Sequence, residues 1–200
     1  MASSVPLDRF NPAEYDFDHP PISHRLNGWL AGLWGGARVY QPFFESRGGL
    51  RGDERVLDFG CGRGVATDRI ARMLVKGGRV TGVDASSYYA RVARRRLASF
   101  DNAEVVHGDV RDAELELGSY DVVCLLFAIH EIAWDCRQSV LDHLVRLLKP
   151  GASLWVLEGT KGSHSTPVSE VREVLSLAGA KEGAFELDDY YAATYRKPSD

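Results

Sequence analysis

Most of the chain alternates between short apolar runs and stretches with helical periodicity. The apolar runs, each typical of a buried strand, lie at residues 55–59, 79–84, 103–107, 120–127 and 153–158. The helical stretches lie at residues 64–75, 87–99, 137–148 and 168–178, with a shorter one at 111–117. Strands that alternate with helices predict a parallel sheet covered on both faces. Two strand-like pieces, 182–187 and 190–196, then predict a closing hairpin.

The first fifty residues have a different pattern. Residues 1–23 are polar and contain Pro12, Pro20 and Pro21, which predicts a loosely structured arm. Residues 24–45 place apolar side chains at helical spacing and predict an amphipathic helix interrupted by glycines. We therefore expect an arm and a cap helix at 1–50, followed by one α/β domain at 51–200.

Composition narrows the class of protein. The 200 residues are 44% hydrophobic and 26% charged, as in ordinary globular proteins. A net charge of −4 argues against nucleic-acid binding as the main function. Three cysteines without disulfide-like spacing, Cys61, Cys124 and Cys136, indicate reduced thiols and a cytoplasmic protein. The sequence shows no signal-peptide pattern and no apolar run long enough for a transmembrane helix.

The most informative segment is a glycine loop after the first predicted strand, VLDFGCGRG at 56–64. Its glycines permit a tight turn, and the following helix offers unpaired N–H groups at its start. The spacing departs from the dinucleotide fingerprint G-x-G-x-x-G, and a triphosphate-binding loop is absent from the sequence. Asp58, just before the loop, would repel a pyrophosphate, so the pattern favours a ligand with a cationic end.

Acidic residues also follow the next two predicted strands. Asp84 closes VTGVD at 80–84, and an acid at this strand tip can accept hydrogen bonds from ribose hydroxyls. Asp109, in GDV at 108–110, can accept a hydrogen bond from an adenine amino group, with Val110 against the ring. Three acids at three successive strand ends, in register with a glycine loop, predict a nucleoside site.

In these residues the chain resembles the class I S-adenosylmethionine-dependent methyltransferases. The shared motifs are VLDFGCGRG at 56–64, VTGVD at 80–84, GDV at 108–110, YDVVCLLFAIHEI at 120–132 and LKPGASLWVLEG at 148–159. The resemblance extends over about residues 50–198. It implies a Rossmann-like three-layer α/β sandwich, whose seven-stranded, mostly parallel sheet ends in an antiparallel C-terminal hairpin.

The resemblance also implies S-adenosylmethionine as cofactor and S-adenosylhomocysteine as product. The matching cofactor-binding positions are Asp58, Gly60 and Gly62 for the methionine part, Asp84 for the ribose with Ala85 beside it, Asp109 and Val110 for the adenine, and Phe127 beside the cofactor at the end of the fourth strand.

Methyl transfer requires alignment of acceptor, methyl group and sulfur, and a base only when the acceptor arrives protonated. The fourth strand ends in FAIHEI at 127–132, where ligands sit in such a sheet. We predict His130 and Glu131 as catalytic residues, since His130 can take a proton and Glu131 can assist it or hold a cationic acceptor. The alternative for His130 is a cap or a hydrogen bond beneath the pocket. The spacings H-E-x-x-H and C-x-x-C are absent from the sequence, so no metal site is expected.

The N-terminal helix bears on the acceptor. Such additions cap the pocket in the resembled family, which makes Tyr15, Trp29, Trp34, Arg38 and Tyr40 candidate pocket residues. Core packing and a peripheral membrane contact through 26–37 are alternative interpretations of this helix. The short connections after the fourth and fifth strands favour a small-molecule acceptor.

Two other functions stay open. Aminopropyl transfer would want more acids near the fourth strand than Glu131 and Asp135 supply. The third function is that of a non-catalytic cofactor-binding subunit. The sequence predicts neither the acceptor nor the oligomeric state.

Overall fold

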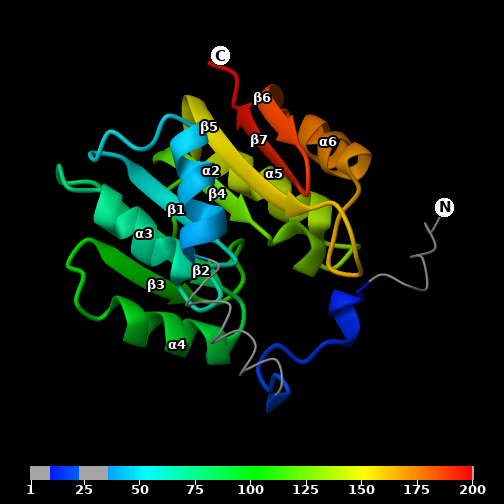
Figure 1. Cartoon of the computed structure of the whole chain (residues 1–200), viewed down its shortest axis with the longest axis horizontal. Helices are drawn as coiled ribbons and strands as arrows, with labels where there is room; N and C mark the ends of the chain where they lie inside the picture. The colour runs from blue at the N-terminus through cyan, green and yellow to red at the C-terminus, as the bar shows by residue number, and fades with distance from the viewer. Residues whose placement is uncertain (1–9, 23–35, 200) are drawn as a thin grey trace.

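The computed structural model describes residues 10–22 and 36–199, which form one seven-stranded sheet with helices on both faces (Figure 1). The strand order is β3-β2-β1-β4-β5-β7-β6. The parallel strands are β1 Arg55–Phe59, β2 Arg79–Asp84, β3 Ala103–His107, β4 Tyr120–Leu126 and β5 Leu148–Gly159. The hairpin of β6 Lys181–Leu187 and β7 Tyr190–Arg196 joins the sheet through β7, which runs antiparallel to β5. The predicted Rossmann-like sheet with a C-terminal hairpin is confirmed.

The helices lie where the sequence periodicity predicts them. They are α3 Val65–Met73, α4 Ser87–Leu97, α5 Arg137–Leu147 and α6 Val168–Leu177. Shorter segments are η1 Pro12–Glu14, the π-helical turn η2 Gly36–Tyr40, α2 Gln41–Ser46 and η3 Ile129–Glu131.

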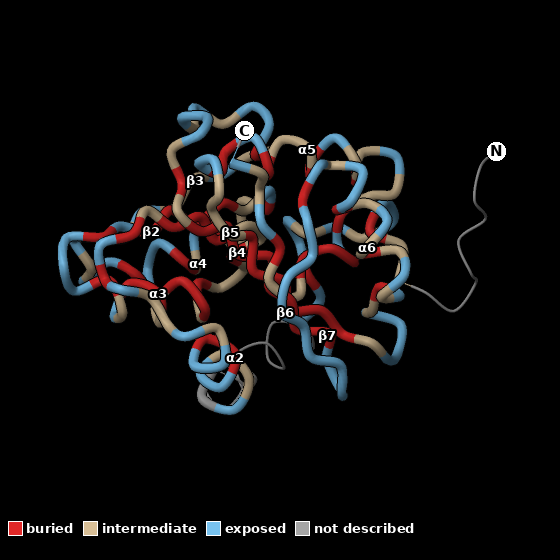
Figure 2. The backbone as a smooth tube through the Cα atoms, turned by 90° about the horizontal axis from the view of Figure 1, so that it is seen from above, coloured by how far each residue is buried: buried red, intermediate tan, exposed pale blue. Residues whose placement is uncertain are grey.

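Alternate residues of the central strands feed two apolar clusters, one on each face of the sheet. Leu57 and Leu125 pack in the cluster that contains α5 and α6, whereas Val56 and Cys124 pack with α2 and α3. Side chains of successive strand residues point to opposite faces, so a sheet covered twice needs continuous apolar runs. Figure 2 shows the buried stretches concentrated in these central strands, with exposed loops around them.

Two local expectations are wrong. The helix predicted at 111–117 is absent, because the chain makes only one turn there, with Asp112 N and Ala113 N both donating to Asp109 O. Strand β5 begins at Leu148 instead of Ser153, although Pro150 and Gly151 suggest a turn. Tyr120 pairs with Leu148 and Val122 with Ser153, so the extra residues 149–152 bulge out of β5 and the strand continues past them.

The N-terminal region can be compared only in part. Of the helix predicted at 24–45, residues 24–35 lie outside the described residues, and so do Trp29 and Trp34. The remainder forms η2 and α2. Phe43 and Phe44 of α2 are buried, and their ring centroids lie 6.4 and 6.2 Å from that of Trp155. This portion therefore packs into the core. Among the described helices, none has the length and apolar character needed to cross a membrane.

Core packing can be tested with two leucines. Leu141 on α5 is fully buried, whereas Leu177 at the end of α6 is 69% exposed. Leu141→Ala should lower the free energy of unfolding by about 2–5 kcal/mol, because it removes buried methylene groups and leaves a cavity. Denaturant unfolding followed by circular dichroism measures the change. The control, Leu177→Ala, should stay within about 0.5 kcal/mol of the wild type, and equal losses would contradict this core.

Candidate active site

The glycine loop connects β1 to α3 at the carboxyl end of the sheet. Gly60 has a φ of 66°, and a Cβ atom there would lie 2.9 Å from Ala128 Cβ, so both backbone conformation and space require glycine. The N–H groups of Gly60 and Cys61 donate to Val83 O at 2.9 and 3.0 Å and fix the loop to β2. The loop therefore presents bare, immobilised backbone beside the strand ends.

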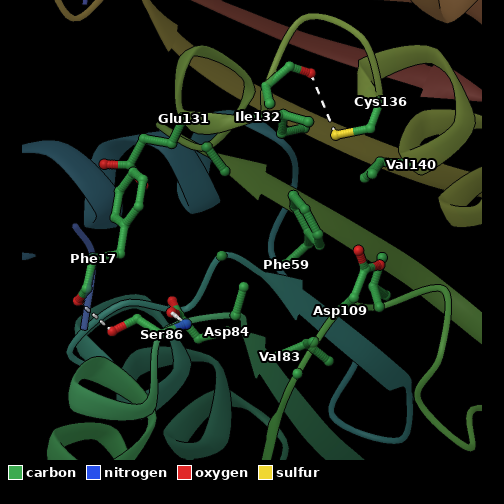
Figure 3. A pocket seen from close by; sticks show the side chains of 16 residues that line it. Phe17, Phe59, Val83, Asp84, Ser86, Asp109, Glu131, Ile132, Cys136 and Val140 are labelled. Carbon is green, nitrogen blue, oxygen red and sulfur yellow. Dashed lines mark hydrogen bonds between the residues drawn. The ribbon is translucent and has the colours of Figure 1, made fainter. Parts of the chain in front are cut away.

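Two adjoining cavities open over these strand ends. Phe17, Gly60, Asp84 and Glu131 line both of them. The first cavity, of about 200 Å³, extends to the loop after β3 at 108–110. Figure 3 shows Phe17 and Glu131 at one end of it, and Asp109, Phe59 and Val140 at the other. The second cavity, of about 450 Å³, is lined by the glycine loop, by η2 and by Tyr190 at the start of β7.

Most of the predicted site residues meet in these cavities. The predicted residues that line them are Asp58, Gly60, Gly62, Asp84, Ala85, Asp109, Val110, Phe127, Glu131 and Tyr40. His130 and Tyr15 line neither cavity, and Arg38 lines a separate groove next to β7. Most residues predicted from the sequence thus line one of the two cavities, whereas His130, Tyr15 and Arg38 do not.

Hydrogen bonds tie the described part of the N-terminal arm to two separate segments of the domain. Ser86 Oγ donates to Phe17 O and Ser87 N donates to Asp18 Oδ1, both at 2.6 Å, which ties the arm to the start of α4. Phe10 N donates to Ser163 O at 3.0 Å on the segment after β5. The described arm therefore connects the start of α4 with the segment after β5, and its Phe17 lines both cavities.

Asp58 is a buried carboxylate with an unusual pKa. The side chain is 1% exposed, and its Oδ2 accepts a hydrogen bond from Thr67 Oγ1 at 2.6 Å. Burial raises the pKa of Asp58 to about 7, the Thr67 hydroxyl opposes this shift, and the charge of Asp84 adds to it. Within the described part of the chain, Asp58 has no basic partner, so a cationic group of a ligand in the second cavity would neutralise the charge of this carboxylate.

Asp84 organises the turn at the end of β2. Its Oδ2 accepts from Gly62 N at 2.7 Å and its Oδ1 from Ser86 N at 2.9 Å. Burial is the main cause that raises the pKa of Asp84. A carboxylate has about four acceptor positions, so these two bonds leave others for a ligand, and Asp84 lines both cavities.

Asp109 carries a partner that the sequence reasoning missed. The Arg111 guanidinium grips both of its oxygens, with Nε 2.9 Å from Oδ1 and Nη2 bonded to Oδ2. This bidentate hydrogen bond lowers the pKa of Asp109. A contact between Asp109 and an adenine amino group stays a prediction, and it would use the remaining lone pairs. Val110, 2% exposed, supplies an apolar surface beside it.

The backbone turns sharply at Phe127, directly after the end of β4. Its φ of 57° is in the left-handed region, which a bulky residue occupies only where the surroundings enforce it. The Phe127 ring lies 6.2 Å from that of Tyr40 and 5.3 Å from that of Tyr190. The strained turn thus places an aromatic ring in the second cavity.

Glu158 orders the segment that follows. This fully buried carboxylate at the end of β5 accepts from His130 Nδ1 at 2.7 Å, from Ile129 N at 3.1 Å and from His130 N at 3.4 Å. Burial lowers the pKa of His130, but the hydrogen bond and charge of Glu158 outweigh it, so the pKa is raised overall. His130 thus makes a buried hydrogen bond of the kind named as the alternative, and its catalytic role stays a prediction.

Glu131 is the member of this segment that faces the cavities. Its side chain is 45% exposed and lines both cavities, and His130 Nε2 lies 3.9 Å from its Oε1. Burial raises the pKa of Glu131 to about 7, and the neighbouring His130 opposes the shift. A carboxylate that titrates near neutrality is suited to take a proton.

Several lining residues escaped the sequence reasoning. Phe17, Tyr89 and Tyr190 line the second cavity but come from three distant segments, and the buried Glu158 supports it from below. An acid inside the apolar run of β5 was the one available signal for Glu158, because buried acids require partners.

Comparison with known proteins agrees with this architecture. Residues 56–151 match the family model described as a methyltransferase domain. A demethylmenaquinone methyltransferase from Clavibacter sepedonicus is 35% identical over 105 residues, which are 52% of this chain and 41% of that protein. The match to the methyltransferase domain family thus covers residues 56–151, a little under half of the chain. The chain spans less than half the length of that curated relative.

Solved structures share the fold of this chain. A S-adenosylmethionine-dependent methyltransferase from Aquifex aeolicus superposes with a TM-score of 0.69 at 22% identity, covering 94% of this chain and 98% of that one. An O-methyltransferase family protein from Burkholderia thailandensis gives a TM-score of 0.71 at 20% identity, over 92% and 62% of the two chains. At these identities the likeness concerns the fold.

The cavities fit the cofactor that the superfamily uses. S-adenosylmethionine carries an ammonium group, which matches the buried Asp58, and ribose hydroxyls, which match the free lone pairs of Asp84. Gly60 leaves open the space that a side chain would fill. The residues that line the cavities therefore match S-adenosylmethionine in charge, in hydrogen-bond acceptors and in space.

The pKa of Asp58 predicts a pH-dependent stability. A pKa raised from 3.8 to about 7 means that the neutral side chain stabilises the ligand-free protein fully below about pH 4, and that this stabilisation is lost as the pH rises to about 7. Asp58→Asn should therefore gain stability relative to the wild type over this range, by on the order of 1 kcal/mol per pH unit.

Urea unfolding at several pH values measures this difference. Asp101→Asn, at an exposed position, is the matched control, and its difference from the wild type should not follow the same course. A flat difference between Asp58→Asn and the wild type over this range would contradict a buried, uncompensated Asp58.

Proposed function

We propose that this protein is an S-adenosylmethionine-dependent methyltransferase that acts on a small molecule. One observation supports this above the others: Asp58, a buried acid without a basic partner among residues 10–22 and 36–199, lies beside the glycine loop and Asp84 and lines a cavity. When bound, S-adenosylmethionine supplies an electrophilic methyl group on a sulfonium sulfur.

The chain's own residues have three tasks in this proposal. Asp58 binds the ammonium group of the cofactor, and Asp84 binds its ribose. Phe17 and Phe127 exclude water from the second cavity, which raises the strength of polar contacts inside it. Glu131 accepts a proton from the acceptor, while Glu158 and His130 hold the segment that carries it.

The cavities and the cysteines bear on the size of the acceptor and on the cellular location of the enzyme. The cavities together have room for a cofactor and a small acceptor, which favours small molecules over macromolecules. The cysteines at 61, 124 and 136 are free thiols, which supports a cytoplasmic location.

Labelled cofactors test the function directly. S-adenosylmethionine labelled in its methyl group is incubated with the protein and a small-molecule extract, in parallel with decarboxylated cofactor labelled in its propylamine chain. Methyl label in a new product is expected. Label only from the propylamine chain would instead identify an aminopropyltransferase, and no transfer together with intact binding would identify a non-catalytic subunit.

Cofactor affinity should depend on Asp84. Asp84→Ala should weaken S-adenosylhomocysteine binding by about 1–3 kcal/mol, because ribose hydroxyls and two backbone N–H groups lose their acceptor. Isothermal calorimetry measures the dissociation constant. Asp101→Ala at an exposed position serves as the control, and an unchanged constant for Asp84→Ala would count against the assigned ribose site.

The rate of methyl transfer should depend on the charge of Glu131. With a pKa of about 7, Glu131 is protonated and inactive as a base at lower pH, so kcat at saturating cofactor and acceptor should rise as the pH passes about 7. Glu131→Gln should lower kcat by about two orders of magnitude and remove this rise. A wild-type pH profile retained by Glu131→Gln would exclude Glu131 as the base.

A further inference from the structure

Five aromatic side chains line the second cavity, and each comes from a different part of the fold. They are Phe17 of the arm, Tyr40 of η2, Tyr89 of α4, Phe127 after β4 and Tyr190 of β7. The Phe127 ring meets that of Tyr40 at 63° and that of Tyr190 at 77°. Rings at such steep angles pack edge to face against one another, and together the five rings form an aromatic lining of the second cavity.

A carboxylate shares this aromatic enclosure. Glu131 lines the same cavity, and its charge is among the causes, after burial, that raise the pKa of Tyr40 and raise that of Tyr89 to about 12. Both phenols are therefore neutral hydroxyls near one negative charge. Figure 3 shows that Glu131 also lies beside Phe17.

The charge of the lining selects against anions. Asp58, Asp84 and Glu131 line the second cavity, and among the described residues Arg63 is its single basic lining residue. The Arg63 guanidinium lies 5.8 and 5.7 Å from the ring centroids of Tyr88 and Tyr89, so it is already engaged with these rings. With Asp58 and Asp84 assigned to the cofactor, Glu131 is left for the acceptor.

We propose that the acceptor is an amine that enters as an ammonium ion, held between these aromatic faces and the Glu131 carboxylate. This inference rests on the proposed methyltransferase function. Aromatic faces attract cations through their quadrupole, and a nearby carboxylate adds to this attraction in a partly desolvated site. A neutral phenol would use the rings without the charge, and a carboxylate or phosphate acceptor would be repelled.

The proposed transfer balances in protons and electrons. The ammonium gives one proton to the Glu131 carboxylate, which frees the nitrogen lone pair. That lone pair forms the new N–C bond while the C–S bond breaks and its electron pair stays on sulfur. The methylated amine leaves as a cation or loses its proton to water, and Glu131 returns its proton to solvent.

A charged probe and its uncharged isostere test the recognition. The protein is first loaded with S-adenosylhomocysteine and then titrated with choline or with 3,3-dimethylbutan-1-ol, in which carbon replaces the quaternary nitrogen. Calorimetry should show saturable choline binding at least tenfold tighter than that of the alcohol. Equal affinities, or no choline binding to the loaded protein, would overturn the proposal.

Matched variants locate the binding. Glu131→Gln should weaken choline binding at least tenfold, whereas Glu173→Gln, at an exposed position on α6, should leave it unchanged. Tyr190→Ala should weaken it several-fold and Tyr190→Phe should retain it, because the ring face persists. Choline binding that is insensitive to both Glu131→Gln and Tyr190→Ala would place the cation elsewhere and refute this site.

The loading step separates this inference from the proposed function. If S-adenosylhomocysteine does not bind, the proposed function fails. If it binds and methyl label passes to a phenol or thiol but to no primary or secondary amine, the function stands and the amine inference fails.

Discussion

The charge of Asp58 is buried at the end of β1 with a threonine hydroxyl as its partner, and this is the constraint on which the site depends. A carboxylate in such a place is costly unless a cation joins it or it takes up a proton. The free-energy cost of burying the Asp58 carboxylate has a function, because at this strand end a ligand's ammonium group can be bound away from water. The unliganded protein should therefore bind a cationic ligand in preference to a neutral one. The glycine backbone beside Asp58 has no side chains, which leaves room for that ligand.

The register of the parallel strands converts this local feature into a site. Pairing of Asp58 with Gly82 and of Asp84 with His107 sets the tips of β1, β2 and β3 along one edge of the sheet. On the other side, β5 carries Glu158 to the end of β4, where it collects the N–H groups of the η3 turn. Glu131 lies in the cavities because its neighbours are tied to Glu158, so a residue outside the lining determines the geometry of one inside it.

The strands, four helices and the part of the cavity lining at the strand ends could be predicted from the sequence, because these follow from short-range pattern. Strand ends coincide with a change from apolar runs to glycine and acid, so Asp58, Asp84 and Asp109 were visible. The short helix at 111–117 was not real, because the side chain and carbonyl of Asp109 already close a turn there. Contacts between distant segments, such as Arg111 with Asp109 and the aromatic walls from five elements, have no local signature. The hydrogen bond between His130 and Glu158 could not be predicted for the same reason, since the two residues are 28 positions apart.

The division of acids between two ligands explains why the cavity carries more negative charge than one cofactor requires. Sulfonium and ammonium groups together need counter-charges, but a second cation beside a sulfonium would be repelled in a low-dielectric cavity. Glu131, shared between both cavities, stands where it can offset that repulsion until the acceptor gives up its proton. Once the proton moves, Glu131 is neutral and the acceptor nitrogen is uncharged, so the electrostatic obstacle to attack disappears at the step that creates the nucleophile. A carboxylate with an ordinary pKa would hold the cation but would not take its proton, whereas a pKa near 7 permits both.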